Sequence, residues 1–304
     1  MEFTFNNHLK YTIKDRTFGF RKTPYEKYQV SVGKIDLDYY QKNTWKTEQY
    51  RIGSLVLDNL GKDFVLLYSG LNSELILRIL LSLNIKPILI FIRFVGNYNL
   101  EEYYHAAKTA NDLGIELSVF DYDIVDNFHS GELTEFADSF QCSTIMQAVL
   151  CHSVHKLQSP TIIGQKTIFR KKITLNNVDW YYSFPETANA SNIRYSLKYH
   201  IPVISEWFSY TPESIAYLLD NIDLNSETYK FKLSTNSTQN QIFNQLIPKL
   251  TITTHKTGYE NLYGLMTEFL LRGSRFHGGF DNNIDGINLK ELKTQLYGDG
   301  YDNS

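Results

Sequence analysis

The sequence predicts an α/β protein with an open, doubly wound parallel sheet, and three observations point to this class. Short apolar runs alternate along the chain with segments whose apolar residues recur at helical spacing. Each connection between the runs is long enough for a helix, as a parallel crossover requires. Small or polar residues follow most of the runs, where ligands of such sheets bind. We therefore expect a Rossmann-like architecture with its functional site beyond the carboxyl ends of the strands.

Composition narrows the class of protein. The 304 residues are 42% hydrophobic and 21% charged, which is ordinary for a globular chain with a sizeable core. A formal charge of −3 does not indicate a nucleic-acid partner, and two cysteines are too few for a disulfide framework. The most apolar window, residues 75–95, is interrupted by charged residues and Pro87, so it is not a membrane span. Without a signal peptide or membrane partner, the expected location is the cytoplasm.

Five strands, with helices between them, are expected in order. The predicted strands are residues 62–70, 86–94, 115–124, 159–165 and 201–208. The predicted helices are 51–61, 71–84, 100–114, most of 125–157, and the segment that begins at Pro212. Gly61 and Gly114 end two of these helices, and Asn99 and Thr211 are expected to cap two others.

Polar segments flank this predicted core. Residues 1–50 are expected to form an N-terminal arm or small β-element, and residues 51–221 the α/β domain. Residues 222–304 are expected to form a C-terminal helical extension. It contains an Asn/Ser/Thr-rich excursion at 222–246 and an Asp/Asn/Gly-rich tail at 281–304 that we expect to be flexible.

The loop after the first strand is the most specific feature, in the run FVLLYSGLNSEL at residues 64–75. Backbone N–H groups at a helix N-terminus are unpaired and carry the positive end of the helix dipole, so this turn suits a phosphate. The alternative is that Asn72 or Ser73 caps the helix. Neither GxGxxG nor GxxxxGK[ST] is present, so two well-known phosphate-binding motifs are excluded.

The stretch YSGLNSEL at residues 68–75 resembles the SGGxDS loop of the PP-loop ATP pyrophosphatases, an adenine nucleotide alpha hydrolase-like superfamily. That group includes GMP synthetase, asparagine synthetase and, more distantly, PAPS reductase. The match requires that one glycine is missing and that the aspartate has become Asn72. Further along, the chain resembles an asparagine-synthase-related or PAPS-reductase-like branch that is frequent in phages. The segments that carry this likeness are SGELTEFADSFQC (130–142), PTIIGQ (160–165) and HKTGYENL (255–262). The resemblance extends over about residues 51–262.

The resemblance implies an enzyme of a bacterial or phage-infected cytoplasm that binds ATP and Mg²⁺. It would attach AMP to a carboxylate or carbonyl oxygen of a small-molecule substrate and release pyrophosphate. An amine, ammonia or a sulfur nucleophile would then displace AMP. Neither cysteine stands in a nucleophile turn of a glutaminase, so ammonia would come from solution, from a partner chain or from the substrate itself.

The resemblance also implies site residues. The ATP- and pyrophosphate-binding positions are Ser69, Gly70, Leu71, Asn72, Ser73 and Glu74, with Arg93 and Phe94 on the adenine side. Candidate catalytic residues are Asn72 and Lys256, a late lysine suited to neutralising pyrophosphate charge together with Arg272 or Arg275. The candidates on the substrate side are Gln141, Cys142, Gly164, Gln165 and Lys166.

Asp121 and Asp123, at the end of the third predicted strand, are weaker candidates for binding magnesium. The alternative there is a solvated strand end at which Asp126 caps a helix. Asn72 offers Mg²⁺ a neutral oxygen and is a poorer ligand than aspartate. A second hypothesis is therefore a nucleotide-binding protein that has lost catalysis and acts in an assembly. A third, a sulfonucleotide reductase relative, is disfavoured because no cysteine follows Cys151.

Overall fold

The structure is a computed structural model, and it describes nine ranges of the chain. These are residues 10–17, 24–140, 142, 145–164, 168–173, 178–183, 186–220, 258–272 and 287–299. For residues 10–17, 24–30, 168–173, 178–183, 186–190 and 269–272 only the backbone is described.

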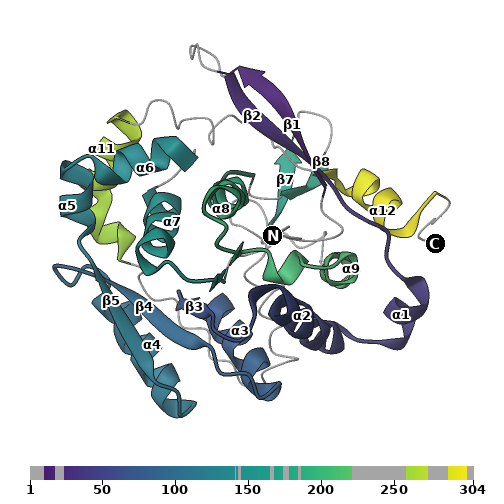
Figure 1. Ribbon diagram of the computed structural model, residues 1–304. Helices are drawn as coiled ribbons and strands as arrows, with labels where there is room; N and C mark the ends of the chain where they lie inside the picture. The colour runs from purple at the N-terminus through teal and green to yellow at the C-terminus, as the bar shows by residue number, and fades with distance from the viewer. Residues whose placement is uncertain are drawn as a thin grey trace.

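Five parallel strands form the central sheet (Figure 1). They are β3 (Val65–Tyr68), β4 (Ile88–Phe94), β5 (Leu117–Tyr122), β6 (Thr161–Ile163) and β9 (Val203–Ile204), arranged in the order β5-β4-β3-β6-β9. Every neighbouring pair is parallel. Counted along the chain, the order is 3-2-1-4-5, so the direction of winding reverses between β3 and β6. The predicted open, doubly wound parallel sheet is confirmed.

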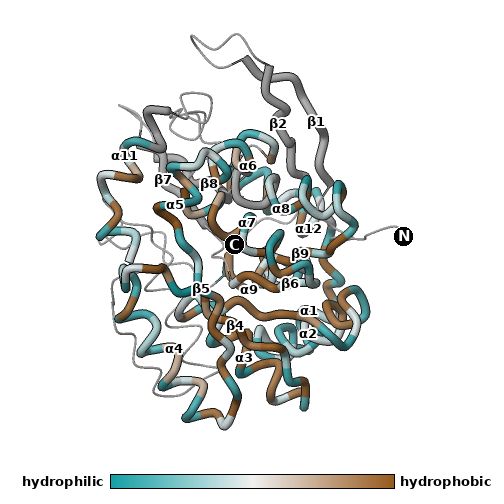
Figure 2. Tube along the Cα trace, turned by 60° about the vertical axis from the view of Figure 1, so that its left-hand side comes forward, coloured by the Kyte–Doolittle hydropathy of each residue, from teal (hydrophilic) through white to brown (hydrophobic). Residues whose placement is uncertain are grey.

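Helices cover both faces of this sheet (Figure 1). One face carries α2 (Trp45–Leu60), α3 (Leu71–Ser82), α4 (Leu100–Asp112), α9 (Pro212–Asp220) and α12 (Leu289–Tyr297). The other carries α5 (Ile124–His129), α6 (Glu132–Phe140), α7 (Ile145–Leu157) and α8 (Glu186–Tyr199). Alternate residues of each strand enter the two cores, because side chains of a strand alternate between its faces. With both faces covered, β4 is hydrophobic over nearly its whole length (Figure 2).

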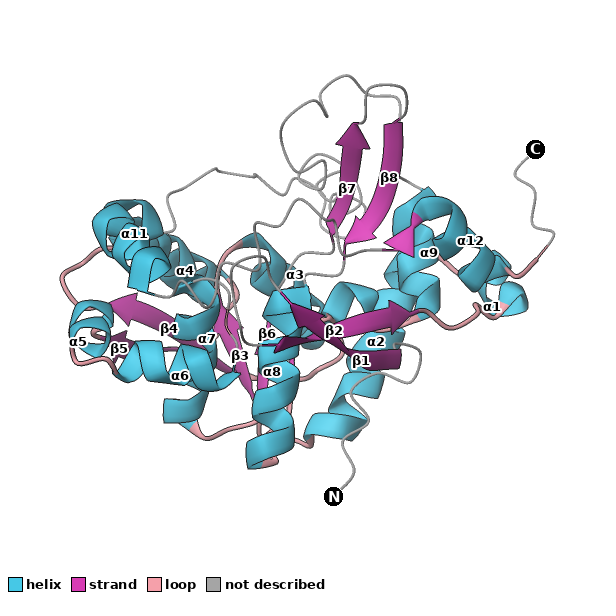
Figure 3. Ribbon diagram, turned by 90° about the horizontal axis from the view of Figure 1, so that it is seen from above, coloured by secondary structure: helices cyan, strands magenta, loops and turns pink. Residues whose placement is uncertain are grey.

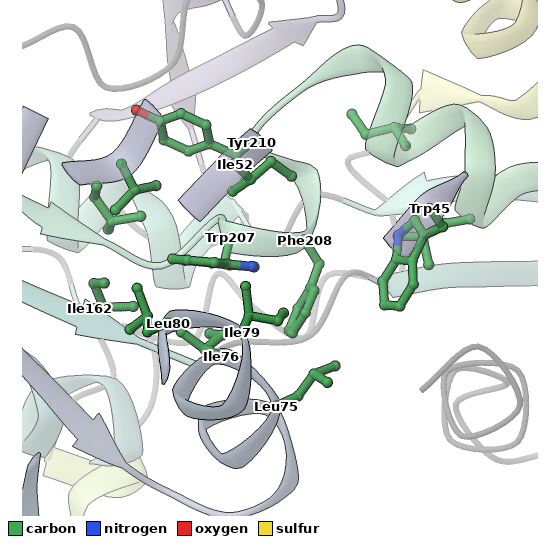
Figure 4. Close-up of a cluster of buried hydrophobic side chains, with 14 of the residues drawn as sticks. Trp45, Ile52, Leu75, Ile76, Ile79, Leu80, Ile162, Trp207, Phe208 and Tyr210 are labelled. Atoms are coloured by element: carbon green, nitrogen blue, oxygen red, sulfur yellow. The ribbon is translucent and has the colours of Figure 1, made fainter. Parts of the chain in front are cut away.

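Trp207 lies at the centre of the larger core (Figure 4). It belongs to the 3₁₀-helix η1 (Trp207–Ser209), and its ring packs among residues of α3 and β6, which are Ile76, Ile79, Leu80 and Ile162. Its indole N–H donates to Gln49 Oε1 at 3.1 Å, which satisfies the buried polar end. The strand predicted at residues 201–208 is therefore shorter, because the chain leaves the sheet after Ile204 and turns Trp207 into the core.

Two antiparallel elements accompany the main sheet. The strands β1 (Lys10–Thr17) and β2 (Pro24–Ser31) pair as a hairpin within the expected N-terminal segment. The strands β7 (Ile168–Ile173), β8 (Val178–Ser183) and β10 (Ile287–Asn288) form a second sheet, and β7 and β8 stand apart from the central strands (Figure 3). This second sheet was not predicted from the sequence.

Segments from the two ends of the chain pack together. The helix α1 (Leu37–Lys42) follows the hairpin, and just before it the Ile35 N–H donates to the Leu296 carbonyl oxygen at 2.9 Å. In α12 the side chains of Leu289, Leu292 and Leu296 are buried in the core. The tail expected to be flexible at residues 281–304 thus includes a packed helix. The expected polar excursion at 222–246 lies outside the described residues.

Most of the predicted helix ends are observed. Gly61 adopts φ +78° after α2, and Thr211 Oγ1 accepts the Ser214 N–H at the start of α9. Asn99 occupies the N-cap position of α4, but its side chain does not cap the helix, and that prediction was wrong. In the described chain no helix is long and apolar enough to cross a membrane.

Candidate functional site

In open parallel sheets ligands bind where the direction of winding reverses, which in this sheet is at the carboxyl ends of β3 and β6. The two strands pair through Leu67 and Ile163. Immediately beyond, Ser69 and Gly70 lead from β3 into α3, and Gly164 follows β6. The loop that the sequence singled out therefore lies at the topological switch point.

The loop is held in shape by Ser73. Its Oγ accepts the Ser69 N–H at 2.8 Å and donates to the Gly70 carbonyl oxygen at 2.7 Å. Gly70 is the N-cap of α3 and adopts φ +99°, a conformation that favours glycine. No side chain caps this helix, so neither Asn72 nor Ser73 is its cap. The first-turn N–H groups have no acceptor within the helix and remain suited to an anion.

Gly164 presses against the first turn of α3. A Cβ at this position would lie 2.6 Å from Ser73 N and 2.9 Å from Ser73 Cα, closer than carbon atoms approach in folded proteins. Only glycine fits here without moving backbone. The end of β6 thereby lies directly against the loop.

We expect Gly164→Ala to destabilise the protein by about 1–3 kcal/mol, because the added methyl group must displace the backbone of α3. The measurement is the free energy of unfolding by urea denaturation. Gly53→Ala in α2 is a suitable control, because its Cβ would meet only the movable tip of Leu83 at comparable distance, 2.6 Å. Equal effects of the two substitutions would contradict the close packing of β6 against the loop.

Two loop residues present acceptor oxygens of different kinds. Asn72 is 7% exposed, and its Oδ1 is buried without a hydrogen-bond partner among the described residues. Glu74 instead receives two hydrogen bonds from Arg78, at 2.7 and 2.9 Å. Burial opposes its ionisation, but the hydrogen bonds from His105 and Arg78 outweigh this and lower the pKa of Glu74. Glu74 is thus engaged by an ion-pair network between α3 and α4.

The adenine-side candidates lie on opposite faces of β4. Arg93 forms a two-pronged ion pair with Asp121 of β5, at 2.6 and 2.8 Å. Phe94 is buried and meets Tyr259 edge-on, with ring centroids 5.1 Å apart. Consecutive residues of a strand point to opposite faces, which explains the separation. Arg93 therefore does not reach the same space as Phe94.

The weak magnesium candidates have other partners. Asp121 is held by Arg93, whose hydrogen bond lowers the pKa of Asp121. Asp123 caps α5, since its Oδ1 accepts the Asp126 N–H at 2.9 Å. The cap is therefore Asp123, and the expectation that Asp126 caps was wrong. Among the described residues no three His, Cys, Asp or Glu side chains are grouped as a metal site.

The substrate-side candidates are only partly described. Cys142 is fully buried in the core beside Cys151, and Gly164 lies at the switch point. Neither cysteine forms a disulfide. Six candidate residues lie outside the described residues or have no described side chain, namely Gln141, Gln165, Lys166, Lys256, Arg272 and Arg275.

A carboxylate that the sequence analysis did not single out reaches the loop. Glu102 of α4 is only 8% exposed, and its Oε1 lies 3.8 Å from the position of a Cβ on Gly70. Burial, and then the neighbouring charge of Glu260, raise the pKa of Glu102 to about 7. The sequence does contain a signal for the burial of Glu102. At helical spacing Glu102 falls on the same face of α4 as Ala106 and Ala110, which are buried.

Glu260 comes from η3 (Tyr259–Leu262), which docks against the start of α4. Asn261 Nδ2 donates to the Tyr98 carbonyl oxygen at 2.8 Å, joining segments 163 positions apart. A Cβ on Gly258 would lie 2.4 Å from Asn99 Cβ. Glu260 Oε2 accepts the Gly258 N–H at 2.9 Å. Residues 258–262, the described part of the segment HKTGYENL, thus pack against the start of α4.

Asn99 forms the platform for this docking. Its Oδ1 accepts the Phe94 N–H and its Nδ2 donates to the Ile92 carbonyl oxygen, both at 2.8 Å. These backbone groups end β4 without strand partners, so the amide side chain satisfies them instead of capping α4. The start of α4, and with it Glu102, is thereby fixed to the end of the sheet.

No protein-family model and no curated protein matches the sequence. Among solved structures, the chain is similar to a predicted subunit of tRNA methyltransferase from Methanocaldococcus jannaschii, with 18% identity and a TM-score of 0.31. That match covers 62% of this chain and 93% of the other. NMN synthetase from Francisella tularensis is 9% identical, with 72% and 98% covered and a TM-score of 0.31.

Translation initiation factor eIF-2B from Pyrococcus horikoshii OT3 is 14% identical, with 45% and 56% covered and a TM-score of 0.25. Similarities this distant indicate neither the family nor the activity of the chain. The α/β class rests on the sheet itself, whose five parallel strands follow the order 3-2-1-4-5.

Proposed function

We propose that this chain binds ATP at the loop of residues 69–74 and adenylates a small-molecule carboxylate or carbonyl group with release of pyrophosphate. The observation that carries the proposal is the uncapped first turn of α3 at the switch point between β3 and β6. Backbone N–H groups in such a turn bind phosphate through both hydrogen bonds and the helix dipole. The resemblance of YSGLNSEL to the PP-loop supports the same assignment.

Each part of the loop has a task in this proposal. The N–H groups of Leu71 and Asn72 hold the departing pyrophosphate, and the internal bonds of Ser73 keep the turn in shape before ATP arrives. Gly164 packs against the first turn of α3 and so fixes the position of the helix end relative to β6. Bound ATP supplies the AMP group and the leaving group. A nitrogen or sulfur nucleophile completes the reaction, with ammonia taken from solution or from a partner chain.

Isothermal titration of ATP with Mg²⁺ tests the site. We expect Ser69→Asp to weaken ATP binding at least tenfold, because Ser69 is exposed at the loop and a carboxylate there repels phosphate. Ser54→Asp, on an exposed position of α2, is the matched control and leaves the affinity unchanged. No ATP binding by the unmodified protein, or equal affinity of both variants, would refute the proposed site.

A second candidate function is a nucleotide-binding protein without catalysis, and Asn72 favours it. A pyrophosphate-release assay with candidate carboxylate substrates separates the two. Release by the unmodified protein supports the enzyme. ATP binding without release, followed by release from Asn72→Asp, supports the non-catalytic protein, because aspartate restores a charged oxygen ligand for Mg²⁺.

A further inference from the structure

We propose that Glu102 and Glu260 bind the divalent cation that accompanies ATP, replacing the charged ligand that Asn72 does not provide. This inference rests on the proposed function, and it assigns the cation to α4 and η3 instead of to Asp121 and Asp123. It concerns two residues that lie 158 positions apart and that only the docking of η3 brings together.

The first observation is the state of Glu102. Its side chain is more than nine-tenths buried and points toward Gly70, at 3.8 Å from the Cβ position of that residue. Within the described residues no hydrogen-bond donor and no cationic side chain contacts its carboxylate. A buried carboxylate without a partner is costly, since charged groups in protein interiors are normally paired or bound to metal.

The second observation is the amide oxygen of Asn72. It is buried and has no hydrogen-bond partner in the described structure, and it belongs to the same loop, two residues after Gly70. Glu102 and Asn72 therefore both present acceptors at this loop, where no described side chain donates to them. Acceptor oxygens of this kind can bind a cation, whereas an anion would be repelled.

The third observation is the charge of Glu260. Gly258 packs against Asn99, three residues before Glu102, so the docking of η3 brings Glu260 to the start of α4, and its charge contributes to the raised pKa of Glu102. Glu260 is also oriented, because its Oε2 accepts the Gly258 N–H. A divalent cation beside the proposed phosphate-binding turn would be attracted by both acidic side chains.

The number of ligands indicates when the cation binds. The described residues contain no group of three His, Cys, Asp or Glu side chains, so within them no complete metal cage is formed. Mg²⁺ is commonly held by one or two carboxylates together with phosphate oxygens and water. Glu102 and Glu260 fit that pattern, and the cation is expected to bind firmly only with ATP.

The test is titration of ATP in two media, one containing Mg²⁺ and one containing EDTA, with the double variant Glu102→Gln/Glu260→Gln. In Mg²⁺ we expect the variant to bind ATP about tenfold more weakly than the unmodified protein. In EDTA we expect it to bind severalfold more tightly, because two charges that repel phosphate are gone. Glutamine preserves side-chain volume and can still accept the Gly258 N–H.

Glu101→Gln is the matched control, because Glu101 is the exposed neighbour of Glu102 on the same helix. It should leave affinity unchanged in both media. Weaker binding of the double variant in both media, or equal binding in both, overturns the cation site and leaves ATP binding intact. Failure of the unmodified protein to bind ATP in either medium refutes the proposed function, and the cation site with it.

Discussion

Replacing Gly258 with alanine is expected to release η3 from the start of α4, at a cost of about 2–5 kcal/mol. Two effects add. Gly258 adopts φ +89°, and the left-handed conformation costs an L-residue roughly 1–2 kcal/mol. The new Cβ would also lie 2.4 Å from Asn99 Cβ and 2.7 Å from the Tyr98 carbonyl oxygen. Asn99 cannot yield easily, because both ends of its amide are bonded to the end of β4.

Hydrogen exchange of the backbone amides measures this effect. In Gly258→Ala we expect lost protection at residues 258–262 and around Tyr98, together with a lower free energy of unfolding. Gly264→Ala in α11 (Tyr263–Arg272) is the control. No atom lies within 4 Å of its Cβ position, so alanine should be neutral or stabilise the helix by up to about 1 kcal/mol. Unchanged protection in Gly258→Ala would contradict the docking described above.

Replacing Glu206 with glutamine is expected to stabilise the protein at alkaline pH by up to about 3 kcal/mol. Glu206 is 5% exposed, and its Oε2 accepts the Ser205 N–H at 3.0 Å. Burial raises the pKa of Glu206 from 4.5 to about 7, although hydrogen bonds from the backbone act against the shift. A difference of this size corresponds to about 3 kcal/mol.

The direction in which stability changes with pH follows from proton binding to Glu206. Between about pH 4.5 and 7 the folded protein holds a proton on Glu206 that the unfolded chain has released, so stability decreases as pH rises through this window. Above pH 7 the full cost of a buried carboxylate is present, and below pH 4.5 it is absent. Glutamine removes the cost and keeps the acceptor oxygen.

Urea denaturation at pH 5 and pH 8.5 provides the measurement. We expect Glu206→Gln to raise the free energy of unfolding at pH 8.5 and to have a much smaller effect at pH 5. The exposed Glu116→Gln should change it by less than about 0.5 kcal/mol at either pH. The same gain at both pH values would show that Glu206 does not carry a pH-dependent cost.

The central sheet could be predicted because its signals are local. A buried strand is an apolar run, and a helix N-terminus or C-terminus has its own residue types. Residues 65–68, 88–94 and 161–163 were all found in this way. The second sheet of β7, β8 and β10 was missed. The strand β10 has only two residues, and it follows β8 by more than a hundred positions in the chain.

In the candidate site, too, local features were predicted and long-range contacts were not. The loop at Ser69 and Gly70 was predicted because glycine and small residues at a strand–helix junction are recognisable in one stretch of chain. Asn99 was assigned to the wrong partner, because its amide can bond either to a helix or to an unpaired strand end. The sequence cannot distinguish these until the strand end is placed.

By itself, the sequence determined the five parallel strands, the helices between them and the phosphate-suited loop after β3, because hydrophobic periodicity and turn chemistry act over a few residues. Only the tertiary structure decided that Gly164 presses on that loop and that η3, which carries Glu260, docks against the start of α4, which carries Glu102. These contacts join segments far apart in the chain. They depend on how strands order in the sheet and how η3 packs on α4, which are properties of the assembled core.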